Sequence, residues 1–268
     1  MRKAVILARG LGRRMREPSS DARLDASQTM VAETGFKAMM PVGRPFLDYS
    51  LSALADAGYE EVCLVIGPEH DSVRTHYTVT APPRRLRLHF AVQTEPLGTA
   101  NAILAAEEFA GSGHFLLINS DNYYPVSALR ALRSLSEPGV ALFKAGTLIA
   151  GGLTRERILK FAICTVSNDG YLAGIVEKPL ETHSAPDDLD SLVSLNCWRF
   201  PRSFFDSCRG ISLSPRGEYE LPNAVERAIR DFGIAFRVVV CEQSALDLSC
   251  RTDVAIVAQR LRSITANP

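Results

Sequence analysis

The sequence opens with a short apolar strand that leads directly into a glycine-containing, arginine-rich turn. Residues 4–8 are apolar, and the turn that follows carries Gly10, Gly12, Arg13, Arg14 and Arg16. Glycines permit positive φ angles and let the main chain approach a ligand without a Cβ, so consecutive N–H groups can converge on anionic oxygens. Arginines add fork-shaped donors that match phosphate geometry, and a helix that starts here adds its N-terminal dipole. The pattern therefore predicts a turn that binds a polyphosphate.

Two alternatives compete with this prediction for the turn. A dinucleotide-binding fingerprint would place a third glycine at position 15, which is Met15. Three arginines would also crowd a cofactor that needs close backbone approach. A basic loop that binds no ligand is the second alternative.

Strand and helix patterns alternate over the first 150 residues. Apolar runs predict buried strands at 3–8, 62–67, 88–93, 114–119 and 139–144, and amphipathic segments predict helices near 46–57, 69–77, 98–109 and 126–135. Such alternation is typical of a mostly parallel sheet with helices on both faces, where ligands bind beyond the carboxyl ends of the strands. The predicted phosphate turn lies at such an end.

The pattern changes after residue 150. The turn at 167–170 predicts a β-hairpin, and the remaining expected elements are strands at 192–200 and 234–241 and helices near 220–231 and 251–263. The polar segment 17–33 has no clear periodicity, so we expect a surface loop there, either a lid over the site or a disordered stretch. A second, acidic loop is expected at 181–190.

Composition narrows the class of protein. The chain has 268 residues and is 46% hydrophobic, which is enough for the core of one large α/β domain. Its 30 acidic and 30 basic residues balance, which argues against a nucleic-acid or membrane-surface binder that works through bulk charge. Six cysteines without a C-x-x-C pair predict buried thiols in a reducing compartment rather than a zinc site. No apolar stretch reaches the length of a signal sequence or a membrane span, so we expect a cytoplasmic protein.

Further motifs follow the turn along nearly the whole chain. They are Lys37 ahead of Pro41-Val42, Gln93-Thr-Glu-Pro-Leu-Gly98-Thr99, Leu117-Ile-Asn-Ser-Asp121, Ile175-Val-Glu177-Lys178-Pro179 and Asp247-Leu-Ser-Cys-Arg-Thr-Asp253. With Gly10-x-Gly12-x-Arg14 at the start, their types and order resemble the sugar-1-phosphate nucleotidylyltransferases, such as the glucose-1-phosphate thymidylyl- and uridylyltransferases.

The resemblance implies a fold and a reaction. The fold would be a Rossmann-like three-layer α/β/α sandwich with a mixed, mostly parallel sheet. Residues 1–268 would form a single domain, with a nucleotide-binding half at 1–150 and a sugar-phosphate-binding half at 151–268. A sugar-1-phosphate oxygen would attack the α-phosphorus of a nucleoside triphosphate with Mg²⁺, releasing pyrophosphate. The expected partners are these two small molecules, with neither nucleic acid nor membrane, and the hairpin after residue 158 and the C-terminal helix are candidate surfaces for a homo-oligomer.

The resemblance also implies roles for individual residues. The expected catalytic residues are Arg14, Lys37, Asp121 and Lys178, and the expected Mg²⁺ ligands are Asp121 and Asp247. The expected nucleotide-binding residues are Leu7, Ala8, Gly10, Gly12, Arg13, Gln93, Gly98 and Thr99. The sugar phosphate is expected to contact Glu177, Lys178 and Asn196.

Simpler explanations compete for several of these residues. Asp121 follows an apolar strand, which puts its carboxylate at the ligand edge of the sheet, but a loop carboxylate that caps Tyr123 or Tyr124 is the alternative. Lys37 could be a solvated loop lysine, and Gln93 a polar residue at a strand end. The Gln93 amide offers one donor and one acceptor to a base edge, and together with the resemblance it favours UTP or dTTP.

Three departures from the family pattern bear on function. Arg9 stands where the family usually has Ala or Gly, and it either reaches the triphosphate or points to solvent. The span between Arg14 and Lys37 is longer than in compact family members. Ser249 and Cys250 follow Asp247 where glycine and threonine are common. These departures keep a second hypothesis open, a catalytically weak relative that binds a nucleotide sugar as a sensor or regulatory subunit.

Overall fold

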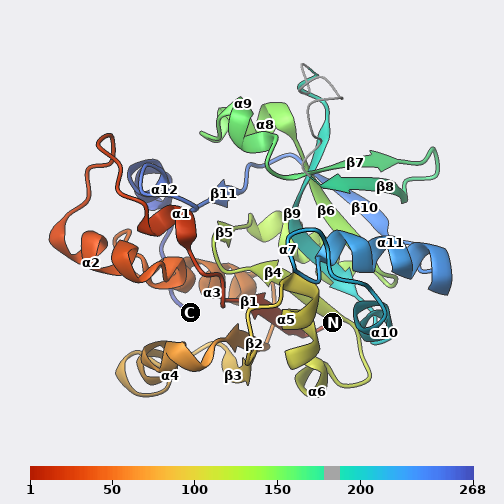
Figure 1. Ribbon diagram of the computed structural model, residues 1–268, viewed down its shortest axis with the longest axis horizontal. Helices are drawn as coiled ribbons and strands as arrows, with labels where there is room; N and C mark the ends of the chain where they lie inside the picture. Colours follow the sequence, from red (N-terminus) through yellow and green to blue (C-terminus); the bar gives the residue numbers. More distant parts are fainter. Residues whose placement is uncertain (178–187) are drawn as a thin grey trace.

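The computed structural model describes residues 1–177 and 188–268 and arranges them around one mixed sheet (Figure 1). Its strands, in spatial order, are β10 (Arg237–Cys241), β6 (Gly139–Lys144), β9 (Leu192–Phe200), β4 (Phe115–Asn119), β1 (Lys3–Leu7), β2 (Glu61–Ile66) and β3 (Arg87–Val92). Strand β7 (Ala162–Val166) also pairs with β9, and β8 (Leu172–Glu177) pairs with β7. Strand β1 pairs in parallel with β2 and β4, whereas β9 runs antiparallel between β4 and β6. The predicted mixed, mostly parallel sheet is confirmed.

Helices cover both faces of this sheet because successive residues of its central strands point to opposite faces and are buried on both. On β1, Ala4 and Ile6 belong to one core cluster and Val5 to the other. The first cluster includes residues of α2 (Ala26–Thr34), α3 (Phe46–Asp56), α7 (Val126–Ser134), α8 (Ala145–Ala150) and α12 (Asp253–Leu261). The second includes residues of α5 (Thr99–Ala105), α6 (Glu107–Ala110), α10 (Phe204–Arg209) and α11 (Leu221–Phe232). The result is the three-layer sandwich, with α10 and α11 to the right in Figure 1 and α2 and α12 to the left.

The predicted elements of the first half match the structure closely for strands and less closely for helices. Each of the five predicted strands lies within one residue of its observed bounds. The helix expected at 98–109 is broken at Ala106 into α5 and α6. The one expected at 69–77 is divided into η2 (Pro68–His70), α4 (Asp71–Thr75) and η3 (His76–Thr80). The hairpin around 167–170 is confirmed, since β7 and β8 pair antiparallel on either side of Gly170.

The expectation of an irregular loop at 17–33 is wrong for its second half. Helix α2 begins after Asp25, whose carboxylate Oδ1 accepts a hydrogen bond from the Gln28 backbone N–H at 2.8 Å. The Gln28 side chain accepts one from the Asp25 N–H in return, at 3.1 Å. This capping box supplies the signal for the start of the helix that the weak apolar periodicity of the segment does not provide.

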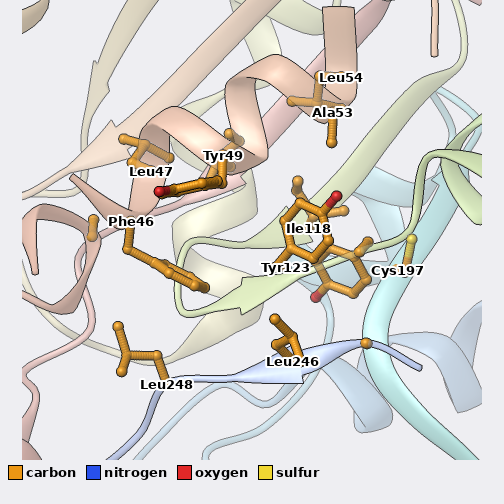
Figure 2. Close-up of a cluster of buried hydrophobic side chains, with 14 of the residues drawn as sticks. Phe46, Leu47, Tyr49, Ala53, Leu54, Ile118, Tyr123, Cys197, Leu246 and Leu248 are labelled. Atoms are coloured by element: carbon orange, nitrogen blue, oxygen red, sulfur yellow. The ribbon is translucent and has the colours of Figure 1, made fainter. Parts of the chain in front are cut away.

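Helix α3 packs against the small sheet formed by β5 (Asn122–Tyr123) and β11 (Leu246–Asp247). Figure 2 shows Phe46 of α3 gathered with Tyr123, Leu246 and Leu248 in one apolar cluster. Leu246 and Leu248 flank Asp247 in the sequence and are both buried. Their burial therefore holds the Asp247 backbone in a fixed position.

All six cysteines are free thiols, and five of them, Cys63, Cys164, Cys197, Cys208 and Cys241, are buried as predicted. Burial raises the pKa of Cys63 and Cys164 to about 12, so these thiols act as packing groups. Within residues 1–177 and 188–268, the helices are all too short or too polar to span a bilayer.

Phe200→Ala is expected to lower the free energy of unfolding by about 3–5 kcal/mol. Phe200 is fully buried, and its ring stacks on Phe204 at a centroid distance of 3.7 Å and on Trp198 at 5.3 Å. Phe232→Ala is the matched control, because that ring is 43% exposed, and it should cost less than about 1 kcal/mol. Urea unfolding of both variants tests the assignment, and equal losses would contradict it.

Candidate functional site

A cavity of about 540 Å³ opens at the carboxyl ends of β1 and β4. Its wall contains the predicted catalytic residues Arg14, Lys37 and Asp121 together with the predicted nucleotide-binding residues Leu7, Ala8, Gly10, Gly12, Arg13, Gln93, Gly98 and Thr99. Asp247 and Asn196 do not line it. Lys178 and the side chain of Glu177 lie outside the described part of the chain.

The turn after β1 depends on one glycine. Gly12 has φ 58° and ψ 30° and precedes α1 (Arg13–Arg16), while a Cβ on it would lie 1.9 Å from the Gly35 carbonyl oxygen. Gly10 has no positive φ, so the predicted use of the left-handed region is wrong for Gly10. Open space lies where its Cβ would stand in the cavity wall, and the expected close approach to a ligand there stays a prediction. The left-handed conformation and the close approach to Gly35 both belong to Gly12.

Of the three arginines predicted to face a phosphate, Arg13, Arg14 and Arg16, two line the cavity. Arg13 and Arg14 do so, and Arg14 Nη2 lies 3.5 Å from the Ser249 hydroxyl. Arg16 instead donates to the Thr34 carbonyl at 2.7 and 3.0 Å, which corrects the expectation that it faces a phosphate. Successive side chains on a helix point about 100° apart, so Arg13, Arg14 and Arg16 cannot all face the cavity. Arg16 is turned toward the end of α2.

Asp121 and Lys37 form an ion pair inside the cavity wall. Asp121 follows β4, and Lys37 begins the short helix η1 (Lys37–Met39). Their side chains are only 23% and 13% exposed, so the alternative that Lys37 is a solvated loop lysine is wrong. The alternative that Asp121 caps Tyr123 or Tyr124 has no support, because the hydrogen bond of the Asp121 carboxylate among the described residues is the one from Lys37.

Asp247 is held by hydrogen bonds on both carboxylate oxygens. Oδ1 accepts from Asn122 Nδ2 at 2.9 Å and from the Ser249 hydroxyl at 3.2 Å. Oδ2 accepts from Arg157 Nε at 2.8 Å and also from Arg157 Nη2. Burial and the neighbouring Asp121 charge raise the pKa of Asp247, and the Arg157 guanidinium opposes that shift. Arg157, on α9 (Arg155–Ile158), is thus the counter-ion of Asp247.

Arg157 and Asp247 lie in the wall of a second cavity, of about 400 Å³, between α9 and α12. The sequence reasoning missed Arg157 because 90 residues separate it from Asp247, and no local motif links the two positions. The pairing of Arg157 with Asp247 can be recognised only once the fold is known.

Gln93 is buried, and its Nε2 donates to the Gly98 carbonyl at 3.1 Å and to Asn101 Oδ1 at 2.8 Å. Both amide donors are therefore occupied, while Oε1 receives no hydrogen bond from the described residues. The prediction that Gln93 offers a donor and an acceptor is corrected to an acceptor alone. Gly98 has φ 101°, and a Cβ there would lie 2.6 Å from the Tyr219 carbonyl oxygen, which ties this loop to the second half of the chain.

Asn196 adopts a left-handed conformation with φ 60° on β9, at the irregularity in the pairing between β6 and β9. Its backbone N–H donates to the Ser194 hydroxyl at 3.3 Å. Neither of the two cavities includes Asn196 in its wall. Asn196 therefore lies outside both cavities, and its predicted grouping with Glu177 and Lys178, which fall outside the described side chains, stays a prediction.

The comparisons with known proteins agree with this geometry. The family described as nucleotidyl transferase matches residues 3–238. The chain is 25% identical to the UTP–glucose-1-phosphate uridylyltransferase AglF of Haloferax volcanii, with 98% of each chain covered. It is 28% identical to a glucose-1-phosphate thymidylyltransferase of Streptomyces griseus, with 99% of this chain and 67% of that one covered. The crystal structure of a UDP-glucose pyrophosphorylase complexed with UDP-glucose shares the fold, with a TM-score of 0.73 and 17% identity over 97% of both chains.

Gly12→Ala is expected to lower the free energy of unfolding by about 2 kcal/mol or more, because the left-handed backbone is strained for alanine and the Cβ meets Gly35. Gly10→Ala is the matched control and should stay within about 0.5 kcal/mol of wild type. Urea unfolding measures both. Similar losses for the two variants would contradict the assignment of the turn conformation to Gly12.

Asp247→Ala is expected to lower the free energy of unfolding by about 3–5 kcal/mol, because it leaves the buried Arg157 guanidinium unpaired. Asp121→Ala should cost less than Asp247→Ala, because Asp121 is more exposed than Asp247 and because its removal relieves the repulsion between the two carboxylates. Chemical unfolding of both variants distinguishes a structural carboxylate from a cavity carboxylate, and a larger loss for Asp121→Ala would reverse the assignment.

Proposed function

Because the chain belongs to the nucleotidyl transferase family, we propose that it joins UTP or dTTP to a sugar-1-phosphate, such as glucose-1-phosphate, to give a nucleotide sugar and pyrophosphate. The observation that carries this proposal is the single cavity that holds the arginine turn, Gln93 and the Lys37–Asp121 pair. The names of the relatives, which specify UTP–glucose-1-phosphate and glucose-1-phosphate enzymes, support the choice of substrates.

The reaction places modest demands on the protein. An oxygen of the sugar phosphate forms a bond to the α-phosphorus, the bond from that phosphorus to the bridging oxygen of the β-phosphate breaks, and pyrophosphate leaves with the electron pair. The nucleophile is already an anion, so no general base is needed. What the site must supply is alignment of the reacting groups and neutralisation of phosphate charge.

The residues of the first cavity suit that task. Main-chain N–H groups around Gly12 and the guanidinium groups of Arg13 and Arg14 are suited to bind the triphosphate. Lys37 offers a further cation beside Asp121. Substrate phosphate can therefore compete with Asp121 for the Lys37 ammonium group.

The state of Gln93 supports a base with an N3–H group. Its Nε2 donors are already used by Gly98 and Asn101, which leaves Oε1 as an acceptor at the cavity wall. Uracil and thymine carry an N3–H donor that Oε1 can accept, but cytosine also carries a donor, its 4-amino group, on the same edge. The choice of UTP or dTTP therefore rests on the names of the relatives more than on Gln93.

Magnesium fits the donor chemistry of Asp121 better than that of Asp247. Mg²⁺ takes hard oxygen ligands, commonly one or two carboxylates with substrate phosphates. Asp121 lines the cavity, whereas Asp247 is nearly fully buried with both oxygens engaged. Asp121 would hold the ion, and Asp247 could join it only after Arg157 releases Oδ2. The bound ion would neutralise phosphate charge and polarise the α-phosphoryl group.

We also propose a single domain in which the two halves share the nucleotide site. Glu218 and Ser249, from the second half, lie in the wall of the same cavity as the turn after β1. The division into a nucleotide-binding half at 1–150 and a sugar-phosphate-binding half at 151–268 therefore describes the main contribution of each half rather than a strict boundary. The free, mostly buried thiols support a cytoplasmic location.

A second candidate is a sensor or regulatory subunit that binds a nucleotide sugar without efficient turnover. The observation that favours it is the engagement of Asp247 by Arg157, Asn122 and Ser249, which reduces the carboxylates free for a metal.

Pyrophosphate release with Mg²⁺ from a matrix of UTP, dTTP, CTP, GTP and ATP against several sugar-1-phosphates tests the two candidates. We expect release with UTP or dTTP that depends on both substrates, and a loss of about 10²–10³-fold in Asp121→Asn, because it removes a charge that the site needs. Asp56→Asn changes an exposed carboxylate paired with Arg85 and should leave the rate unchanged. Binding of nucleotide sugar without turnover by any pair would favour the sensor.

A further inference from the structure

Arg9 is the residue of the phosphate turn that the proposed mechanism leaves without a role. It follows Ala8 and contributes to the wall of the first cavity, beside Gly10 and Arg13. Its side chain is only 8% exposed, so it does not point to solvent as one reading of the sequence suggested. A buried arginine at the ligand edge of the sheet requires a partner of opposite charge.

Glu69 provides that partner only in part. Arg9 Nε donates to Glu69 Oε1 at 3.2 Å, and Nη2 donates to Oε2 at 3.4 Å. Both distances exceed the roughly 2.7–2.9 Å that is usual for hydrogen bonds between a guanidinium and a carboxylate. The Arg9–Glu69 pair is therefore loosely made.

The third nitrogen of the guanidinium has no partner at all among the described residues. Nη1 is shielded from solvent, and it donates no hydrogen bond to any of the described residues. Buried side-chain donors without an acceptor are uncommon in folded proteins, and each one calls for an explanation such as a missing anion. The unpaired donor belongs to a residue that lines the cavity with Arg13 and Arg14.

Glu69 is placed so that it can release Arg9. Its side chain is 47% exposed, and its carboxyl group folds back over Gly67, where a Cβ would lie 2.4 Å away. It can therefore turn into solvent without unpacking the core. An anion in the cavity would then replace it on the guanidinium.

We propose that Arg9 is an additional phosphate-binding residue, which contacts the β- or γ-phosphate of the nucleoside triphosphate and is held by Glu69 when no nucleotide is bound. This assignment rests on the proposed function, since it requires a triphosphate in the first cavity. The phosphate would supply an acceptor for the buried Nη1 donor, and the long Arg9–Glu69 hydrogen bonds would be easily exchanged for bonds to that phosphate.

The test is isothermal titration calorimetry of UTP, UDP and UMP, or of the thymidine series if the pyrophosphate assay selects dTTP. Arg9→Gln is expected to weaken UTP binding by about tenfold or more and to leave UMP binding unchanged, because only the terminal phosphates lose a charged hydrogen bond. Arg9→Lys should weaken UTP binding less, since it keeps the charge and loses the fork. Glu69→Gln should tighten UTP binding, because it removes the competitor.

The exposed pair of Arg2 and Glu60 supplies matched controls, with 69% and 54% exposed side chains. Arg2→Gln and Glu60→Gln make the same charge changes as the test variants and should leave UTP binding at the wild-type level. Urea unfolding of the Arg9 variants confirms that they are folded at the temperature of the titration.

Three results would overturn the proposal. If Arg9→Gln and Glu69→Gln weaken UTP and UMP binding by the same factor, the pair only shapes the turn. If Arg9→Gln leaves UTP binding unchanged, Arg9 does not contact phosphate. If the wild-type protein binds no triphosphate, the assignment of Arg9 fails together with the proposed function. Tight binding without pyrophosphate release would count against the proposed function alone.

Discussion

The register between β1 and β4 is the constraint on which the site depends. Leu7 pairs with Asn119, and the Ser120 backbone N–H donates to the Leu7 carbonyl at 3.0 Å. The two strands therefore end at the same level, so the glycine turn that follows one and Asp121 that follows the other face a single cavity. A shift of one residue would move Ile6 into the core cluster that contains Val5, and Val5 into the one that contains Ile6, so packing on both faces favours one register.

The same site carries an electrostatic arrangement in which each candidate metal carboxylate already has a cation. Lys37 neutralises Asp121, and Arg157 neutralises Asp247. The Lys37–Asp121 pair lies at the open cavity, where in the proposed reaction substrate phosphate and a divalent ion would exchange partners with it. The Arg157 and Asp247 side chains are only 12% and 4% exposed, and Leu246 and Leu248, which flank Asp247, belong to the apolar cluster of Figure 2, so this pair contributes to the structure at least as much as to ligand binding.

Most of the sheet and of the first cavity could be predicted from the sequence. The strands are buried on both faces and read as short apolar runs, and residues that follow such strands gather at one edge of a parallel sheet. This is why Arg14 and Asp121 could be placed near each other without coordinates. The prediction of a loop at 17–33 is wrong in its second half because a capping box rather than an apolar stripe starts α2. The prediction that Arg16 faces a phosphate is wrong because the direction of a side chain on a one-turn helix depends on its neighbours.

By itself, the sequence determined the fold class, the family and the residues of the phosphate turn, since these follow from local apolar patterns and from motifs contained in short segments. Tertiary structure alone decided which side chains meet across the chain. The contacts of Arg157 with Asp247 and of Arg9 with Glu69 join residues 90 and 60 positions apart. Such pairs depend on the packing of α9 and η2 against the sheet, and neither charge nor spacing in a single sequence records that packing. The hydrogen bonds of the Gln93 amide were decided in the same way, since Nε2 donates to the Gly98 carbonyl and to Asn101 Oδ1.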